Sequence, residues 1–209
     1  MPSESASPVT SVAENEWDRS VEEALRLSGL GRAEEREGDL SEALRLYERA
    51  LGLLAGGPPV PLLSEIYRWM GTVRKEMGAS ADAKDLYRRA LDVAERAGSI
   101  GDRASALNCL AVMAQREADM AGAETLYRQA ARLAAQAGKH RLAGMVEQNL
   151  GVLANIRGDL DGALVRYRAS LREFRRARDD EGACWVLNNL GMLLTDTGAF
   201  DRAEQCLDG

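Results

Sequence analysis

The stretch "LGRAEEREGDLSEALRLYERAL" (30–51) is followed 120 residues later by "LGVLANIRGDLDGALVRYRASL" (150–171). Both stretches open on Leu-Gly, continue to Gly-Asp, and end with an alanine, a tyrosine and a second small residue. Glycine and alanine allow two helix backbones to approach closely, so such residues at fixed spacing predict paired helices that cross at these points. The likeness of two distant stretches predicts an internal repeat.

The repeat has a period of 40 residues and five copies. The position after the leucine holds Gly31, Gly71, Ala111, Gly151 and Gly191. The alanine of the second half recurs as Ala43, Ala83, Ala123, Ala163 and Ala203. The aromatic position holds Tyr47, Tyr87, Tyr127 and Tyr167, with Leu207 in the last copy. At this strict spacing, the tyrosines are predicted to fill the core between repeats, with their hydroxyls reaching outward; the alternative is a ligand-binding stripe.

Each copy is predicted to be two helices joined by a turn. Apolar residues recur at intervals of three and four, as in Leu187, Leu190 and Leu194, which is typical of a helix that buries one face. Glycines at the turn favour the left-handed conformation that ends a helix, and aspartates after them favour N-caps. The turn glycines are Gly38, Gly78, Gly158 and Gly198, and the aspartates are Asp39, Asp119 and Asp159. No strand-like alternation occurs, so the predicted fold is an all-α solenoid.

The quoted stretches closely resemble the tetratricopeptide repeat, and the resemblance covers about residues 24–207. It implies a right-handed α-solenoid of five tandem helix-turn-helix repeats that binds other proteins. The period of 40, against the commoner 34, is similar to that of kinesin-light-chain-like and bacterial regulatory arrays. We expect a disordered tail over 1–16 and a repeat domain over 17–209. Its repeats span about 24–60, 61–100, 101–140, 141–180 and 181–209, the last one truncated.

Composition restricts the class of protein. No uninterrupted apolar stretch reaches the roughly 18 residues of a membrane span, and the start "MPSESASPVTSVAENEW" lacks the features of a secretory signal. Cys109, Cys184 and Cys206 are an odd set without metal-ligand spacing, which favours a reducing cytoplasm. The Arg, Ala, Gly and Leu bias indicates a bacterial source with a GC-rich genome.

The first helices of successive repeats are predicted to line a concave groove. Projection at roughly 100° per residue places the following residues on that face: Arg32, Arg68, Trp69, Lys75, Asn108, Val112, Arg116, Met145, Gln148, Asn149, Val152, Asn155, Trp185, Asn188, Asn189 and Met192. The groove is predicted to be cationic at its N-terminal end and rich in amides and apolar side chains at the other. An asparagine side chain both donates and accepts, so a row of them can hold the backbone of an extended peptide.

In similar long-period tetratricopeptide repeats, an asparagine just before Leu-Gly grips the backbone of a bound segment. The resemblance carries this role to Asn149 and Asn189, whereas Cys109 and Trp69 interrupt the row. The alternative is that these amides bond only to the neighbouring helix or to water. The clamp that some tetratricopeptide repeats use for a C-terminal carboxylate is not expected, because Ser28 and Arg32 stand among its positions.

No catalytic, metal or cofactor site is predicted. His140 is the single histidine and is placed in a loop between repeats, so no Ser–His or Cys–His pair is indicated. The acidic run Asp179, Asp180 and Glu181 is expected to lie at the start of a helix. The chain is therefore predicted to be a binding module and not an enzyme.

Two other functions stay open. The chain could be a regulatory or sensory segment of a larger bacterial signalling protein, sensing a peptide or binding an autoinhibitory element. The arginine-rich stretch "VRYRASLREFRRAR" (165–178) could bind nucleic acid, although a net charge of -6 argues against it. We also expect an end-to-end homodimer through the fifth repeat, around Leu193, Leu194, Phe200 and Leu207.

Overall fold

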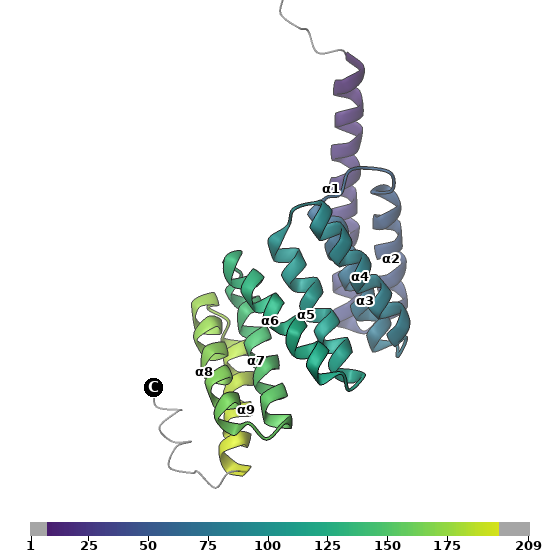
Figure 1. The fold of residues 1–209 in the computed structure, drawn as a ribbon. Helices are drawn as coiled ribbons and strands as arrows, with labels where there is room; N and C mark the ends of the chain where they lie inside the picture. Colours follow the sequence, from purple (N-terminus) through teal and green to yellow (C-terminus); the bar gives the residue numbers. More distant parts are fainter. Residues whose placement is uncertain (1–7, 197–209) are drawn as a thin grey trace, which may run out of the picture. The chain divides into compact units, whose positions relative to one another are not determined.

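The computed structural model describes residues 8–196, which form nine α-helices joined by short turns, without a strand in that range (Figure 1). The chain divides into two compact units, residues 1–98 and 99–209. Unit 1 contains α1 (Pro8–Glu37), α2 (Leu40–Leu53), α3 (Pro61–Glu76) and α4 (Ser80–Arg96). Unit 2 contains α5 (Ile100–Arg116), α6 (Met120–Gln136), α7 (His140–Ile156), α8 (Leu160–Ala177) and α9 (Asp180–Asp196).

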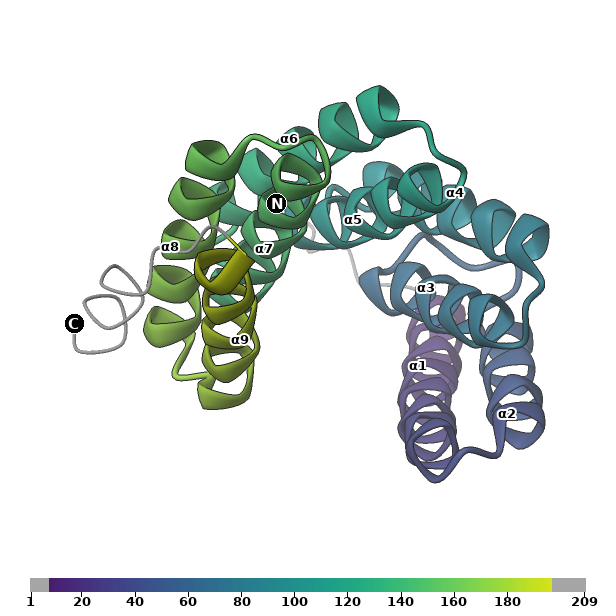
Figure 2. The same cartoon turned by 90° about the horizontal axis from the view of Figure 1, so that it is seen from below.

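Consecutive helices pack as pairs, α1 with α2 and α3 with α4 in unit 1, and α5 with α6 and α7 with α8 in unit 2 (Figure 2). The predicted all-α array of helix pairs is confirmed. The handedness of the solenoid stays a prediction. The second helix expected for the fifth repeat, including Phe200, Cys206 and Leu207, lies outside the described residues.

The N-terminus differs from the sequence prediction. α1 begins at Pro8, inside the segment 1–16 for which composition predicts disorder, and its N-terminal part extends beyond α2 (Figure 1). Trp17 packs against the core of unit 1 and lies on Gly57. This contact anchors the helix, and the turns that precede it need only their own backbone hydrogen bonds.

The recurring tyrosines are core residues, with at most 2% of each exposed. A methyl group built on Gly71 would stand 2.6 Å from Cε1 of Tyr87, and Gly31 and Gly151 meet the tyrosines of their own repeats in the same way. Each of these three rings therefore packs mainly between the two helices of its own repeat, where the glycine backbone leaves space for it. The sequence prediction of a core role is correct, but the ring fills the space within a repeat more than the space between repeats.

The tyrosine hydroxyls reach polar residues of the first helix. The Tyr47 hydroxyl donates to Glu35 Oε2 at 2.9 Å, and the Tyr127 hydroxyl donates to Gln115 Oε1 at 3.0 Å. Burial, together with the hydrogen bond to Glu35, raises the pKa of Tyr47 well above its ordinary value. The phenol therefore stays protonated and keeps acting as a donor.

The turns within repeats form as predicted, with one exception. Asp39, Asp119 and Asp159 each accept a backbone N–H three residues ahead at 2.9 Å. Gly198 lies outside the described residues. Gly38, Gly78 and Gly158 have positive φ, for example +77° at Gly158, but Ala118 occupies the same place in the third repeat with a φ of 62°. A Cβ in the left-handed region clashes with the following carbonyl, so this turn is strained.

We expect Ala118→Gly to raise the free energy of unfolding by about 0.5–1 kcal/mol, because it removes that clash. Gly158→Ala is the matched reverse change, since its added Cβ would meet nothing within 4 Å and would introduce only backbone strain. Urea denaturation of the two variants measures both effects. Equal stability of Ala118→Gly and the parent protein would contradict the strain.

Candidate functional site

Six of the predicted groove residues of unit 2 line two adjoining hollows between α7 and α9: Met145, Gln148, Asn149, Trp185, Asn188 and Asn189. Each hollow has a volume of about 280 Å³. The first is lined by Arg141, Met145, Gln148, Asn149, Phe174, Asp179, Glu181, Gly182 and Trp185, and the second by Gln148, Cys184, Trp185, Asn188 and Asn189. Because both share Gln148 and Trp185, they form one surface, here called the amide groove.

Large apolar side chains on and beside the amide groove are exposed to solvent. Trp185 is 62% exposed, Met192 is 60% exposed and Met145 is 38% exposed. Isolated exposed apolar residues are ordinary, but a tryptophan and two methionines on neighbouring helices supply adaptable contact area for a ligand.

The asparagines of unit 2 play different parts. Asn149 Nδ2 donates to Asn108 Oδ1 at 3.1 Å, across α7 and α5, and Asn108 is only 7% exposed. Asn108 is therefore a buried positioning residue and not the groove residue that projection predicts, because α7 packs over it. Asn188 is exposed and lies near the Met192 sulfur, while Asn189 has no hydrogen-bond partner within residues 8–196. The amide of Asn189 is thus available to a ligand.

Charged residues form one end of the amide groove. Asp179 caps α9 by accepting the Gly182 N–H at 2.9 Å, and it pairs with Arg141 Nε at 2.6 Å. These two interactions hold the pKa of Asp179 below its ordinary value, so the carboxylate is ionised at neutral pH. The sequence prediction that this acidic run opens a helix is correct, but Arg141, Phe174 and Asp179 were not expected to line the groove.

Three predicted groove residues of unit 1 come together around one indole ring. The guanidinium carbons of Arg32 and Arg68 lie 5.2 Å and 5.7 Å from the centre of the Trp69 ring, and Tyr47 stacks on that ring at 5.9 Å. Arg32 also lies 3.7 Å from Glu35, whereas Arg68 has no ion pair within residues 8–196. The predicted cationic character is present in this cluster, and Lys75 lies half-buried on the same helix as Arg68.

The other predicted groove residues do not line these hollows. Val152 packs against the core cluster of α8 and α9, and Val112 is half-buried on α5. Arg116 and Asn155 are exposed near the ends of α5 and α7. His140, placed in a loop by the sequence prediction, is instead the first residue of α7, and its Nδ1 lies 2.8 Å from Glu173 Oε2.

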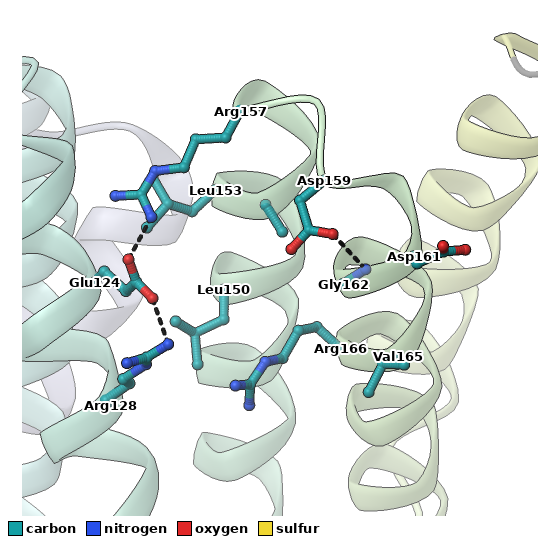
Figure 3. A pocket seen from close by; sticks show the side chains of 11 residues that line it. Glu124, Arg128, Leu150, Leu153, Arg157, Asp159, Asp161, Gly162, Val165 and Arg166 are labelled. Atoms are coloured by element: carbon teal, nitrogen blue, oxygen red, sulfur yellow. Dashed lines mark hydrogen bonds and ion pairs between the residues drawn. The ribbon is translucent and has the colours of Figure 1, made fainter.

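A larger cleft lies on the other side of α7, between α6 and α8 (Figure 3). Its volume is about 490 Å³, and Leu150 and Leu153 of α7 form its floor. Glu124 and Arg128 project from α6, and Arg166 projects from α8 toward the centre (Figure 3). Projection onto a single concave face could not find this cleft, because its residues lie on the opposite side of α7 from Met145 and Asn149.

The described residues contain no cluster of three or more His, Cys, Asp or Glu side chains with the geometry of a metal site. Cys109 and Cys184 are free thiols. None of the helices over residues 8–196 is both long and apolar enough to cross a membrane.

A family model described as tetratricopeptide repeat matches residues 21–96, and a second model with the same description matches residues 184–208. The chain carries tetratricopeptide repeats. This fold class typically serves as an interaction scaffold for other proteins.

Solved structures with the same repeat fold cover most of the chain. The structure of BtubC (BKLC) from P. vanneervenii is 27% identical with a TM-score of 0.72, over 92% of this chain and 85% of that one. A Rap protein complexed with Competence and Sporulation Factor is 17% identical with a TM-score of 0.74, over 89% of this chain and 52% of that one. Aspartyl phosphate phosphatase F from Bacillus subtilis is 14% identical with a TM-score of 0.68, over 94% and 52% respectively.

At 17% and 14% identity the likeness shows the fold alone, and this chain spans about half the length of those two proteins. A search of curated proteins found no match to this sequence.

Asn149 and Asn189 occupy the same position in successive repeats, but their substitution should change the free energy of unfolding by different amounts. Asn149→Ala leaves the buried Asn108 carbonyl without its donor, which costs about 1–3 kcal/mol of unfolding free energy. Asn189→Ala removes an amide with no described partner, so we expect a change within about 0.5 kcal/mol. Urea denaturation measures both values, and equal losses would show that Asn189 is also structural.

Proposed function

We propose that this protein is an interaction module whose amide groove holds an extended peptide segment of a partner protein. The observation that carries the proposal is the presence, on one face of α9, of the unpartnered Asn189 amide, the exposed Asn188 and the exposed Trp185. Such a surface provides both parts of peptide recognition, polar groups for the backbone and apolar area for side chains.

The asparagines would bind the peptide backbone. Each amide offers two donors and an acceptor, which match the C=O and N–H groups of an extended chain. The bond from Asn149 Nδ2 to Asn108 fixes the direction of the Asn149 side chain and leaves its oxygen free to accept a peptide N–H. A side chain fixed in advance loses less conformational entropy when the ligand binds.

Trp185 would supply most of the apolar contact. Aromatic residues carry a large share of the energy in protein interfaces, because one ring buries much area with few rotatable bonds. Met145 and Met192 are flexible and can adapt to different side chains. We therefore propose that the peptide class is defined by one or two apolar residues and not by a strict sequence.

The cluster of Arg32, Arg68 and Trp69 in unit 1 would be a separate contact surface, with a preference for acidic residues. A guanidinium stacked on an aromatic ring keeps its N–H donors at its edge, where they can bind a carboxylate in pairs. Arg68 is the stronger candidate because it has no ion pair within residues 8–196, whereas Arg32 lies beside Glu35.

A second candidate function is the regulatory segment of a longer signalling protein. It is supported by the likeness in fold to the Rap protein that was solved with Competence and Sporulation Factor. In that case the same groove would bind a signal peptide or another part of the full protein. We propose a cytoplasmic location for either function, on the grounds of cysteine usage.

The test selects ligands from a library of random linear peptides displayed on phage and measures their affinity by fluorescence anisotropy. We expect Trp185→Ala to weaken the selected peptides at least tenfold, and Asn189→Ala to weaken them less, with unfolding free energy nearly unchanged in both. Leu25→Ala is the matched control, because Leu25 is an apolar residue of unit 1 with a similar exposure of 59%. Selected peptides that bind all three variants equally would disprove the amide groove as the site.

A further inference from the structure

The fourth repeat departs from the others at two positions that face each other across α7 and α8. The first position holds Leu27, Tyr67, Leu107, Glu147 and Leu187, and the second holds Leu46, Leu86, Leu126 and Arg166. Glu147 and Arg166 thus carry charges where every other repeat has an apolar or aromatic side chain. They form an ion pair, with Arg166 Nη1 at 3.0 Å from Glu147 Oε2.

This ion pair is partly buried, with 37% of the Arg166 side chain and 18% of the Glu147 side chain exposed. Two charges taken from water lose hydration that their attraction only partly restores, so an apolar pair of similar size is often as stable or more stable. The same chain uses apolar pairs at these positions in its first three repeats. The stability of the fold therefore does not explain why Glu147 and Arg166 are charged. A role in binding a ligand does explain it.

At the position just before Arg166, the fourth repeat has an apolar residue where the first three repeats have polar or charged ones. Val165 is 62% exposed, whereas the equivalent residues in the first three repeats are Arg45, Asp85 and Thr125. The fourth repeat thus places an apolar side chain on the outside and charged ones inside. Val165 and Arg166 both lie in the wall of the cleft between α6 and α8 (Figure 3).

The cleft continues beyond the part drawn in Figure 3. A neighbouring hollow of about 340 Å³ shares Arg128, Leu150 and Arg166 with it. Ala131, Arg132 and Ala135 of α6 and Glu147 of α7 complete that second hollow. The result is one channel with an apolar floor at Leu150 and arginines on both walls.

The α6 side of the cleft has an excess of positive charge. Glu124 is the carboxylate partner of both Arg128, at 2.6 Å, and Arg157, which reaches over from the end of α7. Its hydrogen bond with Arg157 lowers the pKa of Glu124, so it stays ionised. Arg132 has no ion pair within residues 8–196. On this side of the cleft, the guanidinium groups of Arg128, Arg132 and Arg157 therefore outnumber the single carboxylate of Glu124.

Two further acidic residues, which pair with none of these arginines, lie at the other end of the cleft, at the start of α8. Asp159 accepts the Gly162 N–H at 2.9 Å as the helix cap, and Asp161 lies on the rim (Figure 3). A ligand that carried negative charge along its whole length would meet repulsion there. The charge distribution favours a ligand whose carboxylates lie only at the end lined by Arg128, Arg132 and Arg166.

We propose that the α6–α8 cleft is a second binding site, which takes an acidic segment of a partner protein with one apolar side chain beside its carboxylates. The apolar side chain lies over Leu150 and against Val165. The carboxylates bind Arg128, Arg132 and Arg166, in the part of the channel where guanidinium groups exceed carboxylates. The site is on the side of α7 opposite the amide groove, so it does not depend on the peptide site proposed above.

The test uses the double change Glu147→Leu and Arg166→Leu, which restores the leucines of the first and third repeats. The probe is the peptide acetyl-Leu-Glu-Glu-amide, which carries its carboxylates on one side of the leucine only; it is titrated into ¹⁵N-labelled full-length protein and followed by amide chemical shifts. We expect shifts at residues 128, 132, 150 and 166 in the parent protein, and binding at least tenfold weaker in the double variant. We expect the double variant to unfold at the same urea concentration as the parent or at a higher one.

Further variants separate binding from folding. Arg132→Ala should weaken the probe without a change in stability, because Arg132 is exposed and has no described ion pair. Arg172→Ala is its matched control, since it removes an exposed arginine at the same position of the next repeat. Trp185→Ala should leave this probe unaffected, so a failure of the amide groove and a failure of this cleft give different results.

Four outcomes would overturn the proposal. One is a large loss of stability in the double variant, which would make the ion pair structural. Another is equal binding of the probe to the double variant and the parent. The third is equal binding of acetyl-Leu-Lys-Lys-amide, which would remove the role of the arginines. The last is tighter binding of a short oligo-dT than of the acidic peptide, which would make the cleft a nucleic-acid site.

Discussion

In the first, second and fourth repeats, the packing of one tyrosine ring on one glycine backbone determines how the helix pair closes. At Gly31, Gly71 and Gly151 a Cβ would stand 2.6–2.7 Å from the ring, so the helices approach as closely as the backbone allows. The third repeat carries Ala111 at this position and still keeps Tyr127 almost fully buried. Because the ring fills the space between the two helices of a repeat, the other sides of the first helix are left for neighbouring repeats and for ligands.

α7 shows what this arrangement allows. Gly144 and Gly151 lie against aromatic rings of α8, and the Ser170 hydroxyl donates to the Gly144 carbonyl at 2.7 Å. One remaining side carries Gln148 and Asn149 of the amide groove, and another carries Leu150 of the α6–α8 cleft. A single helix of this repeat can therefore contribute to two separate binding surfaces.

The period of 40, the helix pairs, the aspartate caps and the buried tyrosines could all be predicted from the sequence, because each depends on contacts within one repeat. Most site residues on α7 and α9 could be placed by helical periodicity for the same reason. The burial of Asn108 could not be predicted, since it depends on how α7 packs over α5. Helical periodicity indicates the direction in which a side chain points, but not whether another helix packs over that side chain. The helical residues 8–16 differ from the composition-based expectation because composition does not register the anchoring contact of Trp17 with Gly57.

In a repeat array, the other copies act as internal controls for each position. Core requirements are the same in every copy, so a residue that departs from the register must have a local reason. Repeats contact only their neighbours, which confines the energetic cost of such a departure to the adjoining helices. An ion pair such as Glu147–Arg166 therefore affects the stability of its own helix pair and of α6 more than that of other repeats. This confinement allows binding chemistry to be added to one repeat while the tyrosine-on-glycine contacts continue to hold the helix pairs together.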